Sequence, residues 1–127
     1  MRIDARELVA IFAGGFAGAV LRALAGDAVP HDPGSWPWAT FAVNVAGAAI
    51  LAALLIWLTG RPWLSAYWRP LVGTGFCGAL TTFSTMQVEL LDMLDAGRAG
   101  LALGYAVASI AVGLLAVTAA THAVRRA

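Results

Sequence analysis

Charged side chains are scarce in this sequence, and lysine is absent. Only 12% of the 127 residues are charged, all eight basic residues are arginine, and the net charge is +1. Soluble proteins carry about 25% charged residues, because even a small domain must present a polar surface to water. The chain also lacks the basic surface that nucleic-acid binding needs, so no nucleic acid is predicted as a partner.

Cysteine and histidine are equally rare. Cys77 is the single cysteine, which excludes an intrachain disulfide and a cysteine-cluster metal site. His31 and His122 lie far apart, without the spacing of a metal-binding motif. Because no nucleophile–base pair or cofactor motif is found either, the sequence does not indicate an enzyme.

Long hydrophobic runs take the place of charge. Hydrophobic residues make up 61% of the chain, and a helix of about 20 such residues crosses a bilayer core. Four stretches reach this length: 8–26, 38–58, 71–94 and 100–121. The pattern predicts one all-α domain over 1–127, with four transmembrane helices and loops too short for a soluble domain.

Arginines in the flanking segments bear on orientation. The N-terminus, the second loop and the tail share one predicted side, and that side holds Arg2, Arg6, Arg61, Arg69, Arg125 and Arg126. The other side holds Arg98, joined by Arg22 if its side chain reaches the headgroups there. This bias favours both termini in the cytoplasm.

The third hydrophobic stretch has an unusual composition. Between Gly73 and Met86 it contains three glycines and five hydroxyl side chains. Glycine lowers helix propensity, and Ser and Thr compete for backbone hydrogen bonds. We therefore predict a break, either buried in protein or lining a cavity, because lipid cannot satisfy non-helical backbone. Carbonyls freed at such a break can coordinate a cation.

Several other polar residues lie within the hydrophobic stretches, and most of them have two interpretations. Asn44 is either a partner in a helix–helix hydrogen bond or an amide donor facing an ion. Tyr105 and Ser109 are four residues apart and share one helix face. Arg22 either extends to the headgroups or attracts anions to a pore mouth. Glu89, near the end of the third stretch, either lies at the membrane interface or faces a central cavity.

Three motifs occur in order along the chain: GGFAGAVLR at 14–22, TFAVNVAG at 40–47 and GFCGALTTFST at 75–85, the last followed by Glu89. Together they resemble the signatures of the Fluc/CrcB family of fluoride-specific ion channels. The resemblance covers essentially the whole chain, and the third motif is specific by itself.

This resemblance implies an antiparallel, dual-topology homodimer in the bacterial inner membrane, which passively exports cytoplasmic fluoride and so protects the cell from fluoride toxicity. It also implies two fluoride pathways and a central, structural sodium ion (Na+). The backbone carbonyls of Gly78 and Thr81 from both subunits would be the sodium ligands.

The resemblance also assigns residues to the fluoride pathway. The pathway residues would be Asn44, Thr82, Phe83, Ser84, Met86, Tyr105 and Ser109, with Arg22 near the vestibule. Phe83 would meet fluoride with the positive edge of its ring. The family usually has a second phenylalanine where this chain has Met86, and we predict that conduction survives this difference.

The uneven distribution of arginines has to be reconciled with the implied dual topology. A dual-topology protein should carry similar numbers of arginines on its two sides. The excess on one side is therefore either too weak to fix the orientation or leads to a less mixed insertion.

The alternative function is a small proton-coupled multidrug or cation exporter, which needs a membrane-embedded carboxylate. No Asp or Glu occurs between Leu8 and Gly26, where such exporters normally carry it. A third possibility, a non-transporting assembly subunit, does not explain the hydroxyl-rich stretch.

Overall fold

The computed structural model describes residues 4–127, so Arg2 lies outside the described part. All regular secondary structure in this part is helical, which confirms the all-α prediction. In chain order the elements are α1 (Ala5–Ala28), α2 (Trp38–Trp57), α3 (Pro62–Trp68), η1 (Arg69–Cys77), α4 (Gly78–Leu80), α5 (Phe83–Asp95) and α6 (Ala99–Arg126).

Three helices, α1, α2 and α6, are long and apolar enough to cross a membrane, with 24, 20 and 28 residues. Within a single chain, only 11%, 22% and 11% of their most apolar windows are buried. Most of this apolar surface would face water if the chain were soluble and alone, which is costly. The protein is therefore a multi-pass membrane protein.

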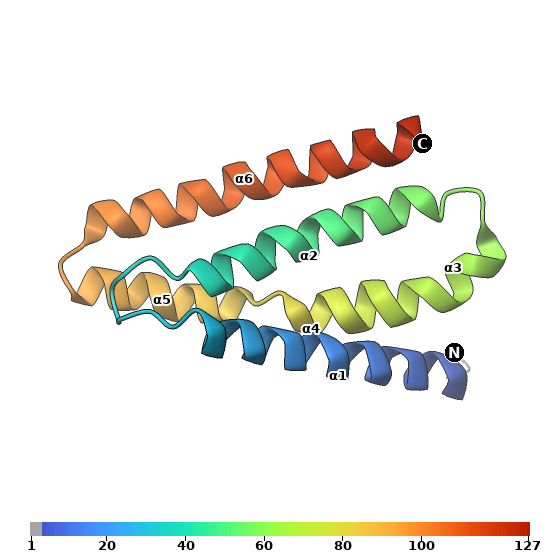
Figure 1. The fold of residues 1–127 in the computed structure, drawn as a ribbon, viewed down its shortest axis with the longest axis horizontal. Coiled ribbons are helices and arrows are strands. Elements are labelled where there is room, and N and C mark those ends of the chain that lie inside the picture. The colour runs from blue at the N-terminus through green and yellow to red at the C-terminus, as the bar shows by residue number, and fades with distance from the viewer. Residues whose placement is uncertain (1–3) are drawn as a thin grey trace.

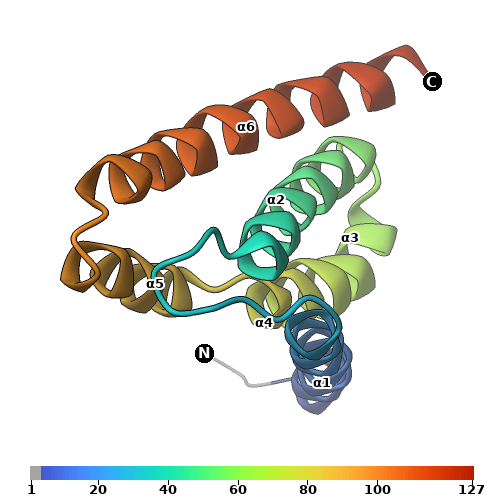
Figure 2. The ribbon, with the colours of Figure 1, turned by 60° about the vertical axis from the view of Figure 1, so that its left-hand side comes forward.

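The helices lie along one long axis, as Figure 1 shows. The start of α1, the end of α6 and α3 lie at one end of the bundle, and the 29–37 loop and the turn between α5 and α6 lie at the other. The closest packing joins α1 to η1 and α2 to α6. The view in Figure 2 separates these two pairs and places α2 between α6 and the η1–α4 segment.

The segment from η1 to α5 is not one continuous α-helix. Its first part, η1, is π-helical, and α4 continues it as far as Leu80. Thr81 and Thr82 then have extended backbone, with ψ values of 152° and 114°. A new helix, α5, begins at Phe83, and the thin trace between α4 and α5 in Figure 1 marks this interruption.

Glycine allows α1 to approach η1 closely. A Cβ atom added to Gly14 would overlap the carbonyl oxygen of Leu71, and one added to Gly75 would lie 2.9 Å from the amide nitrogen of Gly15. Both clashes are with backbone, which cannot swing away as a flexible side chain can. The small residues therefore hold two backbones in contact, as is common in membrane helix pairs.

Candidate functional site

The interruption at Thr81 and Thr82 is held in place by Asn44 from α2. The Asn44 side-chain Nδ2 donates to the Thr82 carbonyl at 3.1 Å, and the Thr82 backbone N–H donates to Asn44 Oδ1 at 2.7 Å. The side chain thus pairs with both backbone polar groups of one extended residue. It replaces helix hydrogen bonds that the break removes, which an apolar environment requires.

Thr82 also starts the following helix. Its Oγ1 accepts from the backbone N–H of Thr85 at 3.2 Å, and its hydroxyl donates to Thr85 Oγ1 at 2.9 Å. Threonine is a favoured residue at this N-cap position because its oxygen satisfies an amide without a helical acceptor. Ser84 lies close by, with its hydroxyl 3.4 Å from that of Thr82.

The hydrogen bonds that the Thr82 and Thr85 amides donate have a consequence for the carbonyls of Gly78 and Thr81. In a continuous α-helix the amides of Thr82 and Thr85 would donate to those two carbonyls, four residues earlier. Here the amides donate instead to the side chains of Asn44 and Thr82. The interruption therefore takes away the regular helical donors of both carbonyl groups.

Both carbonyl-bearing residues line an open groove of about 610 Å³ between α2 and the interrupted segment. The groove is lined by Asn44, Gly47, Ala48, Leu51, Gly73, Thr74, Cys77, Gly78, Thr81, Thr82 and Phe83. The Phe83 side chain lies at this groove, and the residue is 70% exposed in the single chain. The groove is mostly apolar apart from the interruption itself.

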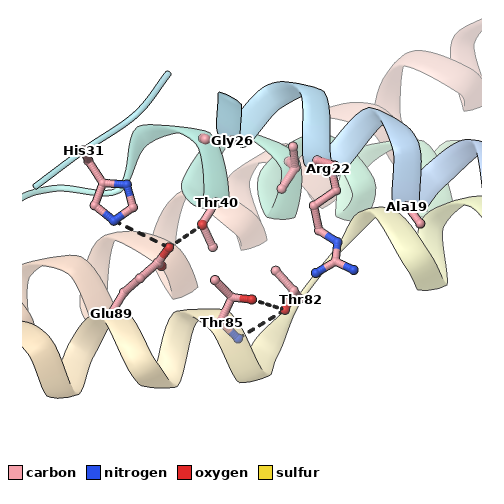
Figure 3. A pocket seen from close by; sticks show the side chains of 11 residues that line it. Ala19, Arg22, Gly26, His31, Thr40, Thr82, Thr85 and Glu89 are labelled. Carbon is pink, nitrogen blue, oxygen red and sulfur yellow. Dashed lines mark hydrogen bonds and ion pairs between the residues drawn. The ribbon is translucent and has the colours of Figure 1, made fainter. Parts of the chain in front are cut away.

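A second cavity, of about 380 Å³, lies on the other side of the interruption, between α1, α2 and α5. Figure 3 shows Arg22 from α1 extending into it towards Thr82 and Thr85. The Arg22 Nε atom is buried and has no hydrogen-bond partner among residues 4–127. Thr82 lines both this cavity and the groove, so the interruption forms a shared wall.

A buried carboxylate closes the cavity at its other end. Glu89 is only 6% exposed, and each of its oxygens accepts one hydrogen bond from a different helix. Thr40 on α2 donates to Oε1 at 2.5 Å, and Tyr105 on α6 donates to Oε2 at 2.8 Å. The His31 imidazole lies 3.9 Å from Oε1, as the dashed line in Figure 3 marks. Glu89 therefore packs among the helices and lines the cavity, in agreement with the second of its two interpretations.

An aromatic cluster packs against the ring of Tyr105. Tyr105 is fully buried, and the rings of Trp36 and Phe41 lie with their centroids 5.3 and 6.4 Å from its ring. Met86 packs against the same core and lines neither cavity. Trp36 and Phe41 thus fix the position of the hydroxyl that reaches Glu89.

The structure brings together most of the residues that the motifs single out. Asn44, Gly78, Thr81, Thr82 and Phe83 gather at the groove. Other predicted residues stand apart. Tyr105 reaches the cavity only through Glu89, and Ser109, half-buried on α6, lines neither the groove nor the cavity.

The predicted pathway residues did not include four polar residues of the cavity, His31, Thr40, Thr85 and Glu89, although Thr85 belongs to the hydroxyl-rich stretch. One signal was available, because Thr85 and Glu89 are four apart and Thr82 precedes Thr85 by three. This spacing places all three on one helix face. Nothing in the local sequence indicates that Thr40, 49 positions from Glu89, is its partner.

Fold and site together define a helical multi-pass membrane protein with a polar interruption between two cavities. The sequence model of the CrcB family, described as CrcB-like protein, Camphor Resistance, matches residues 9–121. The chain therefore belongs to the CrcB-like family.

Similar proteins come from several bacteria. "Fluoride-specific ion channel FluC 1" of Mycolicibacterium paratuberculosis is 55% identical over 97% of this chain and 93% of its own length. The protein of the same description from Mycobacterium bovis is 56% identical over the same shares. "Fluoride-specific ion channel FluC" of Bordetella avium is 41% identical over 89% of this chain and 87% of its own length.

Proposed function

We propose that this protein is a fluoride-selective ion channel that lets cytoplasmic fluoride leave the cell passively and so limits fluoride toxicity. The observation that carries the proposal is the Asn44-bound interruption at Thr81 and Thr82, which puts hydroxyls and carbonyls between two cavities. The relatives named as fluoride-specific channels support the same function. As a member of a channel family, the protein is an ion channel and not an enzyme.

The two cavities suit a small, strongly hydrated anion. Arg22 brings a permanent positive charge into the cavity that reaches Thr82 and Thr85, whose hydroxyls can donate hydrogen bonds. On the groove side, the exposed ring of Phe83 can offer its positive edge. Several weak contacts in series replace water without trapping the ion, as conduction requires.

The remaining residues predicted for the fluoride pathway lie around Thr82, around Glu89 and on α6. Asn44 and Ser84 border Thr82, while Tyr105 holds Glu89 at the far end of the cavity. Met86 packs against the core around Tyr105, so its contribution to the pathway would be indirect. Ser109 would join the pathway from α6, the helix that also carries Tyr105.

A structural sodium ion fits the carbonyls of Gly78 and Thr81. Hard cations prefer oxygen ligands, and unwound helix segments supply such carbonyls in membrane transporters. The loss of the regular helical donors at these two positions leaves their oxygens free to bind a cation. The ion would hold two interrupted segments together and would not be transported.

We propose further that the segment 69–95, which contains the third predicted stretch, crosses the membrane as a broken span in addition to α1, α2 and α6. We also propose that the protein works as an antiparallel homodimer. A single chain offers two carbonyls at the groove, and a second copy would supply two more. The small buried share of the apolar helices leaves ample surface for such a partner. With both orientations present, the dimer would hold two fluoride pathways in the bacterial inner membrane.

The first experiment measures fluoride efflux from liposomes that contain only this protein, with a fluoride electrode. We expect rapid efflux of fluoride once a potassium ionophore balances charge, and much slower efflux of chloride under the same conditions. Chloride passing as readily as fluoride, or no efflux of either ion, would refute the proposal.

A second experiment separates the channel from the proton-coupled exporter. Glu89 lines a cavity and is the carboxylate that an exporter would use. An exporter needs it to exchange protons, so a Glu89→Gln variant would lose all coupled transport. We expect instead that fluoride efflux by the wild type runs without a proton gradient and that no cationic drug is carried.

A third experiment tests orientation. Reporter fusions at the C-terminus should give signals on both sides of the membrane in comparable amounts. The opposite result, a single orientation, would exclude the antiparallel dimer and would agree with the arginine bias.

A further inference from the structure

We propose that His31 sets the charge at one end of the cavity, so that fluoride enters faster when this imidazole is protonated. The inference rests on the proposed channel function and adds a control of conduction by pH. It assigns a role to a side chain outside the family motifs, on the loop between α1 and α2.

The geometry makes His31 the partner of a buried carboxylate. Its Nε2 atom lies 3.9 Å from Glu89 Oε1, and its side chain is 30% exposed, so protons can reach it. Within residues 4–127, no arginine comes within ion-pair distance of Glu89. The remaining partners, Thr40 and Tyr105, donate neutral hydrogen bonds. A positive charge next to Glu89 therefore depends on His31.

The other charged groups around this pair are few. From α1, Arg22 projects into the same cavity, and from the loop, Asp32 lines a shallow surface pocket beside His31. From α6, the Tyr105 hydroxyl faces Glu89. The residues of α2 that line the cavity do not titrate. Of the charged side chains that line the cavity, only His31 is of a type whose charge ordinarily changes between about pH 5 and 8.

The charge of the cavity should therefore follow the charge of His31. With a neutral imidazole, the Glu89 carboxylate offsets Arg22 and repels an approaching anion. With an imidazolium, the carboxylate is paired, and the field of Arg22 acts on fluoride without that opposition. Charge of one sign in a narrow cleft raises the local concentration and arrival rate of the opposite ion, and salt weakens the effect.

The position of the loop suits this role. It lies at the end of the bundle opposite the start of α1 and the end of α6 (Figure 1), and Figure 3 shows its imidazole lining the cavity and turned towards Glu89. Arg98 donates a hydrogen bond of 3.3 Å to the Gly34 carbonyl and ties the loop to the start of α6. The imidazole is thus carried by an anchored loop.

The test compares fluoride efflux at pH 8 and pH 6, with equal pH on both sides of the liposomes. Efflux from protein-free liposomes is subtracted at each pH, because neutral hydrogen fluoride crosses lipid. The variants are His31→Gln, which stays neutral, and His31→Arg, which stays positive. His122→Gln is the matched control, since His122 is the other histidine of the chain and bonds only within α6, to the Thr118 carbonyl.

We expect wild-type and His122→Gln efflux to rise roughly three- to tenfold from pH 8 to pH 6. His31→Gln should stay at the low rate and His31→Arg at the high rate, each nearly independent of pH. Elution as a single species in detergent would show that both variants fold.

Two results would overturn the role of His31 while leaving the channel intact. One is a pH-dependent rise that persists in His31→Gln, and the other is a loss of efflux by the same factor at both pH values. Wild-type protein that passes no fluoride at either pH would overturn the channel proposal itself, and the inference with it.

Discussion

The side chain of Asn44 and the backbone of Thr82 form a reciprocal pair of hydrogen bonds, at 3.1 and 2.7 Å, across 38 positions of sequence. An amide is the side chain suited to this task because it carries a donor and an acceptor side by side. The pair joins α2 to the interruption and so determines where the chain departs from helical geometry.

Replacing Asn44 should therefore destabilise the fold. Asn44→Ala leaves one buried donor and one acceptor of Thr82 without partners, which should cost about 2 kcal/mol or more. Asn44→Asp, as a carboxylate, keeps the acceptor for the Thr82 N–H but loses the donor to the Thr82 carbonyl, so it should also destabilise the fold. The midpoint of thermal unfolding in detergent measures the effect, with Thr118→Ala as an exposed control whose hydroxyl bonds only within α6. An Asn44→Ala midpoint equal to that of the wild type would contradict the prediction.

The two donors to Glu89 should be energetically coupled. Tyr105→Phe and Thr40→Val each remove one hydrogen bond to the same carboxylate, and each should cost about 1 to 3 kcal/mol. Because both donors satisfy one group, the double variant should depart from the sum by about 0.5 kcal/mol or more. A double-mutant cycle by denaturant titration in detergent checks this. Additive costs would show that the two contacts are independent.

The contact between α1 and η1 should tolerate no extra methyl group. Gly75→Ala places a Cβ atom against the backbone of α1 and should cost about 1 to 3 kcal/mol or prevent folding. Gly104→Ala is the matched control, because a Cβ atom at Gly104 meets nothing within 4 Å in the single chain. Yield and thermal stability of the two proteins, prepared in parallel, test the difference. Equal stability would show that the two backbones can separate without cost.

Met86 should permit conduction. Its side chain packs against the core around Tyr105, so its contribution to the pathway is indirect. We expect fluoride efflux from the protein with Met86 and, within about threefold, from Met86→Phe, because a phenylalanine adds bulk to a packed region without adding charge. The liposome assay measures both proteins side by side. Efflux that appears only after the substitution would show that an aromatic ring is required at this position.

Much of the architecture could be predicted from composition. The apolar stretches indicate the long helices because a bilayer sets their length, and Trp38–Trp57 agrees with the predicted 38–58 within one residue. The ends in polar surroundings are less well determined, since α6 continues to Arg126 beyond the predicted 121. Helices of this kind can extend into water with no change in backbone hydrogen bonding.

The site was harder to predict because its contacts join distant positions. The anomaly at 81–85 is visible in the sequence, since glycine and hydroxyl residues there conflict with a lipid-facing helix. The partner of Glu89 is not visible, since a carboxylate at the end of an apolar stretch has the same pattern whether it faces headgroups or a threonine on α2. Only the packing of α2 and α5 against α6 distinguishes these cases.

The position of Glu89 bears on how the protein is made. Of its two hydrogen-bond donors, Thr40 is synthesised before it and Tyr105 after it, so the carboxylate has only half of its partners while the ribosome is still extending the chain. The last helix must therefore be in place before the charge is fully shielded. Insertion of α5 and α6 as one hairpin would meet this need, and a ribosome stalled between them should leave a chain that the membrane quality-control proteases remove.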